Sequence, residues 1–312
     1  MSNSEKIMHF ANFNITFGTN EEPMLLHFDD IIFPAFLSDH KREKENEYPQ
    51  FYFSDVKVKK IDDEYVLVGN YIKDTKYEIY TTMKDGELVS TPSSVPTAPY
   101  SRFIVFLRNH RMVLVRNESQ SPDVRSFQAT TREVIFSYIR NYNHNTVKKE
   151  DRLPHSHINI VDIPLPSDIE AVLKDVKKIN YLKMRFFPLN NDINPVPMSQ
   201  DIDEQMKRMK CKNANVQFTS PESKDEVKGL IERSAGLAVS TLLITDENGN
   251  KTKIKEEQFS SSTRIPFGRD ISSDDDEYLA KQAKKNEVVS TVSKDNNSLY
   301  ERLKESIAKL IN

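Results

Sequence analysis

The chain has 312 residues, of which 29% are charged and 37% hydrophobic, an ordinary composition for a globular protein large enough for two cores. No apolar run approaches the roughly 20 residues of a membrane span, and the net charge of -3 argues against general polyanion binding by the whole surface. The single cysteine, Cys211, excludes an intramolecular disulfide and a cysteine-rich metal site. The N-terminus has no secretory pattern, which predicts a cytoplasmic protein.

The first third of the chain alternates polar and apolar residues with the period of two that half-buried strands show. Strands are expected at "IMHFANFNIT", at "QFYFSDVKVKKIDDEYVLVGNYI" with a turn at Asp62-Asp63, and at "YEIYTTMKDGELVS" with a turn at Asp85-Gly86. "LLHFDDIIFPAFL" predicts a short helix interrupted at Pro34. The stretch "TPSSVPTAPYS" (residues 91–101) is rich in proline and predicts a loop that ends an antiparallel meander.

A hairpin with a basic turn from Arg108 to Arg111 is expected at "RFIVFLRNHRMVLVR". The next segment, "SPDVRSFQATTREVIFSYIRNY", has apolar residues at helical spacing, with Ser121 as the candidate N-cap. We expect this helix to cover one face of the sheet. The polar stretch "NYNHNTVKKEDR" that follows predicts a domain boundary near residue 148.

The second half of the chain alternates between strands and helices. Strands are expected at "HSHINIVDIPL", "KMRFFPL" and "ANVQFTS". Helices are expected at "SDIEAVLKDVKKINYL", capped by Ser167, at "SQDIDEQMKRMKCK", capped by Ser199, and at "SPESKDEVKGLIERSAG", capped by Ser220 and stopped by Gly236. A hairpin around Asn248-Gly249 is expected in "LAVSTLLITDENGNKTKIKEEQF".

Beyond Gly268 the sequence is polar and acidic, and we expect a mobile segment there. One helical stripe in the final stretch should dock on the body or on a partner chain: Leu299, Leu303, Ile307, Leu310 and Ile311. The expected fold class is α+β. A β-rich N-terminal meander domain with a covering helix (1–148) precedes an α/β-layered domain that ends in a hairpin (149–268). A polar acidic segment with an amphipathic C-terminal helix (269–312) completes the chain.

Two histidines, His155 and His157, open the strand at "HSHINIVDIPL". Residues two apart in a strand face the same side, so these two side chains can reach one ligand. A metal site needs at least a third protein ligand, and Asp162 has the opposite parity. The sequence also contains no glycine-rich phosphate loop and no G-x-S-x-G motif. We therefore expect an ordinary strand edge, with no catalytic residue, no metal and no cofactor.

Basic residues are concentrated in two segments. Residues 101–155 carry ten basic residues against five acidic ones, and residues 174–212 carry nine against five. Such side chains pair with phosphate oxygens and position a nucleic acid without reading its sequence. The candidate nucleic-acid-binding residues in these segments are Arg102, Arg108, Arg111, Arg116, Lys177, Lys178, Lys183, Arg185, Lys207, Arg208 and Lys210. The alternative is a solvated face that acidic segments such as "EKENE" and "DDDE" neutralise within the chain.

Several segments follow one another in the order and type of a known family. They are the paired histidines of "HSHI", then "LPSDIEAVLKDV", the apolar strand and acid-isoleucine step of "MRFFPLNNDI", and the turn of "LLITDENGN". Before them comes the hairpin "FIVFLRNHRMVLVRNES" with its helix. Over most of residues 60–260 the chain thus resembles the RexA-like family of phage-exclusion proteins, with Kiwa-type DNA-binding defence proteins as a looser parallel. The segment after residue 268 departs from the family pattern.

The resemblance implies a non-catalytic protein of phage exclusion, or abortive infection, that binds DNA with little sequence preference. It also implies a homodimer and a membrane protein as effector partner. We predict no small-molecule substrate. Since the family has no catalytic motif to match, the resemblance assigns only phosphate contacts, to Arg108, Arg111, Arg116, Lys177, Lys178, Lys183 and Arg185. Two other functions stay open. One is a metal-dependent nuclease or phosphoesterase that uses His155 and His157, and the other is a protein-protein adaptor without nucleic-acid binding.

Overall fold

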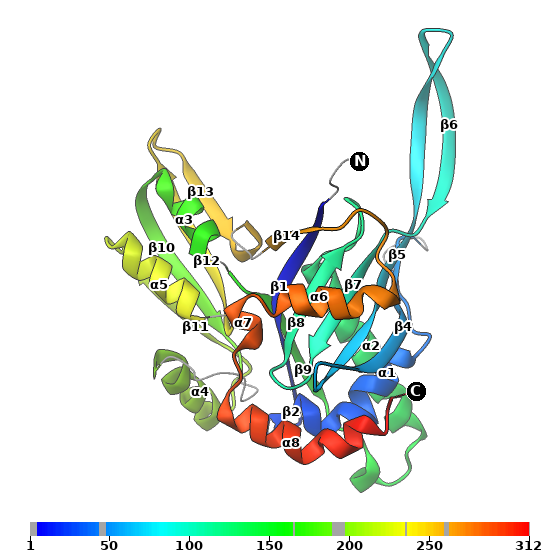
Figure 1. Cartoon of the computed structure of the whole chain (residues 1–312). Helices are drawn as coiled ribbons and strands as arrows, with labels where there is room; N and C mark the ends of the chain where they lie inside the picture. Colours follow the sequence, from blue (N-terminus) through cyan, green and yellow to red (C-terminus); the bar gives the residue numbers. More distant parts are fainter. Residues whose placement is uncertain are drawn as a thin grey trace.

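The computed structural model describes residues 5–43, 48–164, 166–188, 197–234, 236–258 and 262–311. It confirms the predicted α+β class, with two antiparallel sheets and helices packed on them. Figure 1 shows two lobes. The small lobe is formed by the described residues between 166 and 258, and the large lobe by those before and after them. Within the described ranges, no helix is both long enough and apolar enough to cross a membrane.

An antiparallel sheet of ten strands forms the centre of the large lobe. Its main order is β14-β1-β8-β7-β5-β4-β3, while β2 and β9 pair with β1, and β6 pairs with β5. The bounds are β1 (Glu5–Phe17), β2 (Glu22–Pro23), β3 (Arg42–Glu43), β4 (Gln50–Ile61), β5 (Glu64–Lys84), β6 (Glu87–Thr97), β7 (Tyr100–Phe106), β8 (Arg111–Arg116), β9 (Ser156–Asp162) and β14 (Ser262–Pro266). Although β9 and β14 come from residues 149–268, expected as one domain, both pair with β1. The chain therefore leaves the large lobe after β9 and returns to it at β14.

Helices cover both faces of this sheet, because its central strands are apolar on both sides. On β7, Phe103 and Val105 belong to one core and Ile104 and Phe106 to the other, and all four are buried. The first core includes residues of η1 (Met24–His27), η2 (Phe28–Ile32), α1 (Phe33–Leu37), α2 (Val124–Asn145) and α8 (Lys294–Ala308). The second core includes residues of α6 (Asp276–Ala283) and α7 (Glu287–Ser290).

The predicted meander is confirmed, and so are its turns. Asp62, Asp63, Asp85 and Gly86 have positive φ and connect β4 to β5 and β5 to β6. The loop expected at residues 91–101 is wrong except at residues 98 and 99, because its first part belongs to β6 and its last two residues to β7. Prolines are tolerated there because β6 is an edge strand, paired only with β5 among the described strands. The outer parts of β5 and β6 project from the body as a two-stranded ribbon (Figure 1).

The helix starts of the large lobe differ in detail from the sequence prediction. Asp123, rather than Ser121, caps α2, because its carboxylate accepts a hydrogen bond from the Ser126 N–H at 2.8 Å. Pro34 lies in the first turn of α1 and directly follows the π-helix η2, so the change from one helical segment to the next occurs beside this proline. A short turn, η3 (Lys149–Asp151), connects α2 towards β9.

The small lobe has a four-stranded antiparallel sheet in the order β11-β10-β12-β13. Its elements are α3 (Pro166–Lys174), β10 (Val176–Phe186), α4 (Pro197–Met209), β11 (Ala214–Thr219), α5 (Lys224–Ser234), β12 (Ala238–Asp246), β13 (Lys251–Lys255) and η4 (Glu256–Gln258). Apolar residues of α3, α4 and α5 form one core with Leu182, Met184 and Phe186 of β10. The helices therefore cover one face of this sheet.

The helix expected over residues 167–182 is wrong beyond Lys174. β10 starts at Val176, and it has two irregularities in its pairing with β12, before Lys178 and before Tyr181. These irregularities shift the alternation of buried residues, so that Val176, Ile179 and Leu182 repeat every three residues, as they would in a helix.

Three other predicted features of the small lobe have mixed outcomes. Ser199 lies inside α4 rather than at its cap. α5 is capped by Ser223, whose Oγ accepts from the Glu226 N–H at 3.2 Å, and not by Ser220. Gly236 has a positive φ of 79°, as expected of the residue that stops a helix. The "LNNDI" part of "MRFFPLNNDI" and most of "EKENE" lie outside the described residues.

The acidic segment after Gly268 is helical, so the expectation of a mobile segment is wrong. It forms η5 (Ser273–Asp275), α6 and α7, with Asp275 and Asp276 buried. The reason is electrostatic: Lys59 and Arg102 of the sheet pair with Asp276, and Arg269, in the loop after β14, pairs with Asp275. The apolar stripe of α8 docks on the large lobe, with Ile307 buried in its first core.

Candidate nucleic-acid interface

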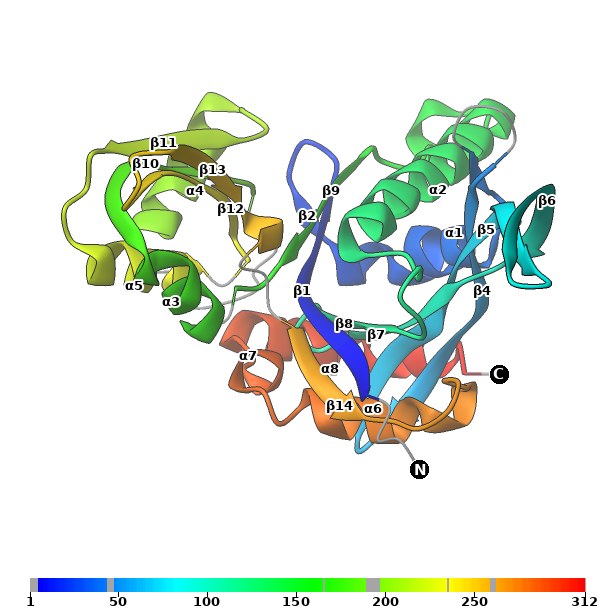
Figure 2. The ribbon, with the colours of Figure 1, turned by 90° about the horizontal axis from the view of Figure 1, so that it is seen from above.

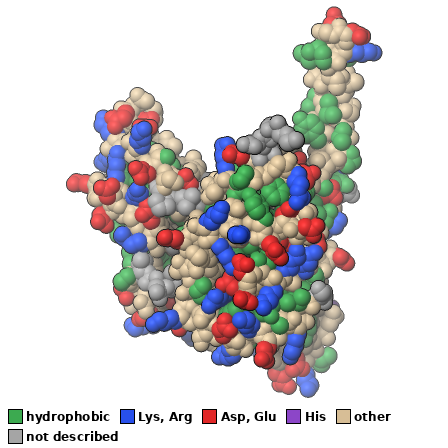
Figure 3. All heavy atoms as spheres, in the orientation of Figure 1, with side chains coloured by type: hydrophobic (Ala, Val, Ile, Leu, Met, Phe, Trp, Pro, Cys, Tyr) green, Lys and Arg blue, Asp and Glu red, His purple; other side chains and the backbone are tan. Residues whose placement is uncertain are grey.

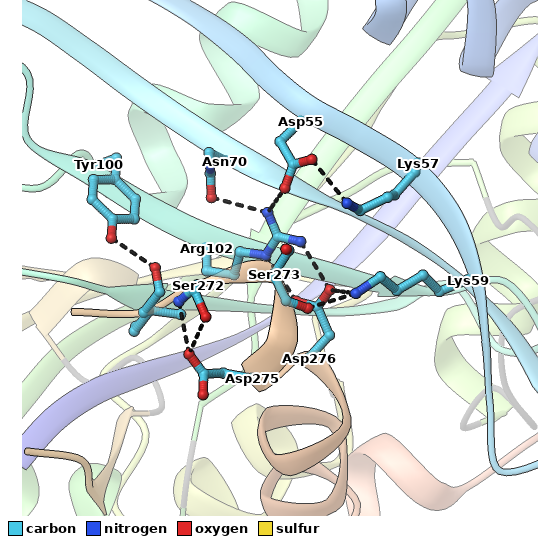
Figure 4. A network of polar contacts seen from close by, with 11 residues as sticks. Asp55, Lys57, Lys59, Asn70, Tyr100, Arg102, Ser272, Ser273, Asp275 and Asp276 are labelled. Carbon is cyan, nitrogen blue, oxygen red and sulfur yellow. Dashed lines mark hydrogen bonds and ion pairs between the residues drawn. The ribbon is translucent and has the colours of Figure 1, made fainter. Parts of the chain in front are cut away.

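Arg102 is buried between β7 and α6 and pairs with carboxylates of the large lobe (Figure 4). Its Nε and Nη2 atoms each donate to Asp276 at 2.8 Å, and Nη1 donates to Asp55 and to Asn70 at 3.0 Å. Burial opposes the charge, but these partners outweigh it and raise the pKa of Arg102. A buried guanidinium held in this way presents no donors to a phosphate in solution. The structure therefore corrects the assignment of Arg102 to the interface.

The other arginines of the hairpin hold it within the large lobe. Arg108 donates from Nε to Asn297 at 2.8 Å and from Nη1 to Glu64 at 3.0 Å. Arg111 is only 2% exposed, and Arg116 donates to the backbone carbonyl of Ser119. The basic turn is thus a structural contact with β5 and α8, and its arginines do not form a common exposed face.

The remaining predicted residues separate into two groups. On α4, Lys207 pairs with Asp203 at 2.7 Å and Arg208 with Glu204 at 3.6 Å, which leaves both charges locally compensated. Lys210 follows this helix and lines a hollow beside His155 and His157. Lys177, Lys178, Lys183 and Arg185 are exposed on β10, a strand and not the helix expected for the first two.

Exposed basic residues occupy the face of the small sheet that α3, α4 and α5 leave uncovered. Alternation along β10 exposes Lys183 and Arg185, because the residues between and beside them are buried. β13 repeats this pattern, with Lys251, Lys253 and Lys255 exposed around buried Ile254. The register places Thr241 of β12 between Lys183 and Lys255. Since neighbouring strands lie about 4.8 Å apart, these two basic positions are about 10 Å apart across the sheet.

This open face forms one wall of a cleft between the lobes, and the N-terminal half of α2 with β9 forms the other. Figure 2 shows β1 and β9 running between the small lobe and α2. Figure 3 shows the notch between the two lobes from the face that carries α6, α7 and α8, with α2 on the far side. The cleft has a volume of about 390 Å³. Its basic residues are Arg125, Arg132, Arg185, Lys253 and Lys255, and its acidic residues are Asp162 and Glu256. We call this site the basic cleft.

The two arginines of α2 are positioned by contacts between that helix and β9. Gln128 donates to the carbonyl of Ile160 at 2.6 Å, and Arg132 donates to the carbonyl of Ile158 at 3.0 Å. Arg125 and Arg132 are seven residues apart, which is two helical turns, so both lie on the side of α2 that faces the cleft. Two arginines on a helix that is hydrogen-bonded to β9 thus face the lysines of the small lobe.

Sequence reasoning found only part of this site. The sequence assigns Arg185 to the interface, but Arg125 and Arg132, which lie within the basic segment 101–155, are not among the candidate residues. The lysines of β13 were missed, although "KTKIK" in a predicted hairpin strand already places three lysines on one face. What the sequence does not show is that β9 brings this face opposite α2.

The two histidines lie at the other end of β9. Their Nε2 atoms are 3.0 Å apart, and their rings are nearly perpendicular, at 85°. Burial, then His155 and Lys212, lower the pKa of His157, and a backbone hydrogen bond with Gly18 opposes this shift. Among the residues that the structure describes, no group of three or more His, Cys, Asp or Glu side chains is placed to hold a metal ion. Within the described residues, the two histidines therefore have no third metal ligand beside them.

No family model, curated protein or solved structure matches this chain. A functional conclusion therefore depends on the geometry and the charge of the sites described above.

Proposed function

We propose that this protein binds DNA with little sequence preference, through phosphate contacts in the basic cleft. The observation that carries the proposal is the convergence of five basic side chains from α2, β10 and β13 on one cleft between two lobes. Among the described residues, two acidic side chains line the same cleft against five basic ones, although the whole chain has a net charge of -3. Such a local concentration of positive charge attracts a polyanion.

The chemistry of these side chains favours backbone contacts over base recognition. Arginine offers a planar fork of donors that fits a phosphate, and lysine offers a mobile point charge. The lysines of β13 lie on an open strand face, while the described helices α3, α4 and α5 pack on the opposite face of the sheet. Phosphate contacts position a nucleic acid without reading its sequence. The expected binding is therefore similar for unrelated sequences and weakens steeply with salt.

The biological setting of the proposal comes from the resemblance to RexA-like proteins. It supports a role in phage exclusion or antiphage defence, in the cytoplasm, as a homodimer with a membrane protein as partner. Arg185 is the residue common to the resemblance and to the basic cleft, and Lys183 lies beside it on the same strand face. These two residues connect the family expectation with the site.

The test is fluorescence anisotropy of two unrelated DNA duplexes over a series of salt concentrations. The cleft variant is Lys253→Glu with Lys255→Glu. The control variant is Arg302→Glu with Lys309→Glu, which changes the net charge equally at exposed positions of α8 and just after it. We expect the cleft variant to raise the Kd at least about tenfold at about 100 mM salt and to lower the slope of log K against log salt by about two.

Three results would contradict the proposal. The first is the absence of binding by the wild-type protein at low salt. The second is an equal loss of affinity in the cleft and control variants, which would show a general effect of charge. The third is binding of one duplex and not the other, since phosphate contacts do not distinguish sequences.

A further inference from the structure

A second hollow is lined by the opposite halves of α2 and β9 from those that line the basic cleft. It has a volume of about 720 Å³. Its charged and titratable lining residues are Arg140, His144, Arg152, His155, His157 and Lys212, with no acidic residue among the described ones. None of these side chains lines the basic cleft, so the two sites are separate.

The two histidines also line a neighbouring hollow of about 360 Å³, together with Lys210, Cys211 and Lys212. The acidic residue there is Glu21. Burial, reinforced by Asp203, raises the pKa of Glu21, while Lys207 opposes this shift. The immediate surroundings of the histidine pair are thus strongly positive, with four lysines and arginines against this one carboxyl group among the described lining residues.

The contact between the two rings constrains their protonation. With the Nε2 atoms 3.0 Å apart, one ring donates a hydrogen bond and the other accepts it, so at least one ring is neutral. If both rings were protonated, two N–H donors would face each other among basic side chains. An anion that accepts from both rings removes this conflict, because it supplies the missing acceptor and the opposite charge.

We propose that the hollow of about 720 Å³ binds a phosphate group and that His155 and His157 take up protons when it does so. A phosphate has several acceptor oxygens and up to two negative charges, which suits two histidines flanked by Lys212, Arg152 and Arg140. The group comes either from the end of a nucleic acid or from a free phosphorylated compound, since the chemistry of recognition is the same. The site does not depend on DNA binding in the basic cleft.

The first measurement uses isothermal titration calorimetry with inorganic phosphate and with sulfate on the full chain. Sulfate keeps its charge between pH 6 and pH 8, so a change in its affinity over that range reports on the protein. We expect sulfate to bind at least about tenfold more tightly at pH 6 than at pH 8, with uptake of protons. The cleft variant Lys253→Glu with Lys255→Glu should bind sulfate as the wild type does.

The variants separate the histidines from the general positive charge. His155→Gln with His157→Gln should bind sulfate more weakly at pH 6 and lose most of the pH dependence. Lys212→Gln, at an exposed position, should weaken binding about equally at both pH values and keep the pH dependence. Because Lys212 is exposed, the Lys212→Gln variant should fold even if the double histidine variant does not, so the proposal can still be tested.

Competition experiments identify the source of the phosphate group. An oligonucleotide with a 5′-phosphate that displaces sulfate better than its 5′-hydroxyl counterpart assigns the site to nucleic-acid ends. Equal behaviour of the two oligonucleotides, with displacement by inorganic phosphate, assigns it to a free phosphorylated compound. The proposal is overturned if neither anion binds at about 20 mM and pH 6, or if sulfate affinity is the same at pH 6 and pH 8.

Discussion

Arg102 on β7 and Asp276 at the start of α6 are joined by two hydrogen bonds of 2.8 Å, although they lie 174 residues apart in the sequence. Both side chains are buried, at 0% and 1% exposure. Lys59 approaches the same carboxylate at 2.6 Å, and Asp55 the same guanidinium at 3.0 Å (Figure 4). This network attaches the acidic segment after residue 268 to the centre of the large sheet.

Removing one member of this network should destabilise the protein strongly. Asp276→Asn leaves the Arg102 guanidinium buried without its main counter-charge, which typically costs about 3–5 kcal/mol. Urea denaturation followed by circular dichroism measures the loss. The matched control is Asp274→Asn, two residues away and exposed, which should change the unfolding free energy by less than about 0.5 kcal/mol. Equal losses of unfolding free energy in the two variants would show that the buried network stabilises the fold no more than an exposed carboxylate does.

Arg108 separates a structural role from a role in DNA binding. Arg108→Ala removes the hydrogen bonds to Glu64 and Asn297, and we expect it to lower the unfolding free energy by about 1–2 kcal/mol. DNA affinity in the anisotropy assay should stay within about twofold of the wild type. A large loss of DNA affinity with an unchanged unfolding free energy would show instead that Arg108 contacts DNA.

The pH dependence of stability should include a contribution from His27. Its Nε2 lies 2.8 Å from Glu22 and its Nδ1 3.2 Å from Asp30. Burial disfavours its charge, but the two carboxylates outweigh burial and raise the pKa of His27. A raised pKa means that the contribution is fully present below the unfolded value of about 6.5 and is lost as pH rises through the folded value.

The variant His27→Gln isolates this contribution. The difference in unfolding free energy between wild type and variant should be larger at pH 5.5 than at pH 9, as measured by urea denaturation at both values. A difference that does not change between these pH values would mean that the protonated ring adds nothing to the folded state.

The ribbon formed by β5 and β6 should be dispensable for folding of the body. Residues 76–96 are exposed, apart from the half-buried Ile79, and Tyr80, Met83 and Leu88 are 69%, 67% and 75% exposed. Replacing residues 76–96 by Asn-Gly, which favours a tight hairpin turn, should shift the Tm by less than about 3 °C. A fall of more than about 10 °C in a thermal unfolding scan would show that the ribbon supports the core.

The elements that the sequence predicted well are those with a regular alternation and a local turn signal. The turns at Asp62-Asp63 and Asp85-Gly86 are examples, because the residues that make a tight turn adjoin the strands that it connects. Prediction failed where pairing disturbed the period. The irregularities of β10 give Val176, Ile179 and Leu182 a helical spacing, and only the register with β12 reveals a strand.

The site was harder to predict than the fold, because a charge in the sequence carries no information about its partner. Arg102 and Arg132 both lie in one basic segment, yet Asp276 neutralises the first within the core while the second lines the basic cleft. The cleft itself depends on β9, which pairs with β1 and brings α2 opposite the small lobe. Such a long-range arrangement has no local sequence signal.

The most direct test of DNA binding in the basic cleft is protection of lysines from acetylation, measured by mass spectrometry with and without a DNA duplex. Lys253 and Lys255 lie in the cleft, while Lys309 is exposed just after α8 on the large lobe. We predict that the duplex slows acetylation of Lys253 and Lys255 several-fold and leaves Lys309 unchanged. A bound duplex that protects other lysines, with those of β13 modified at their free rate, would contradict the assignment.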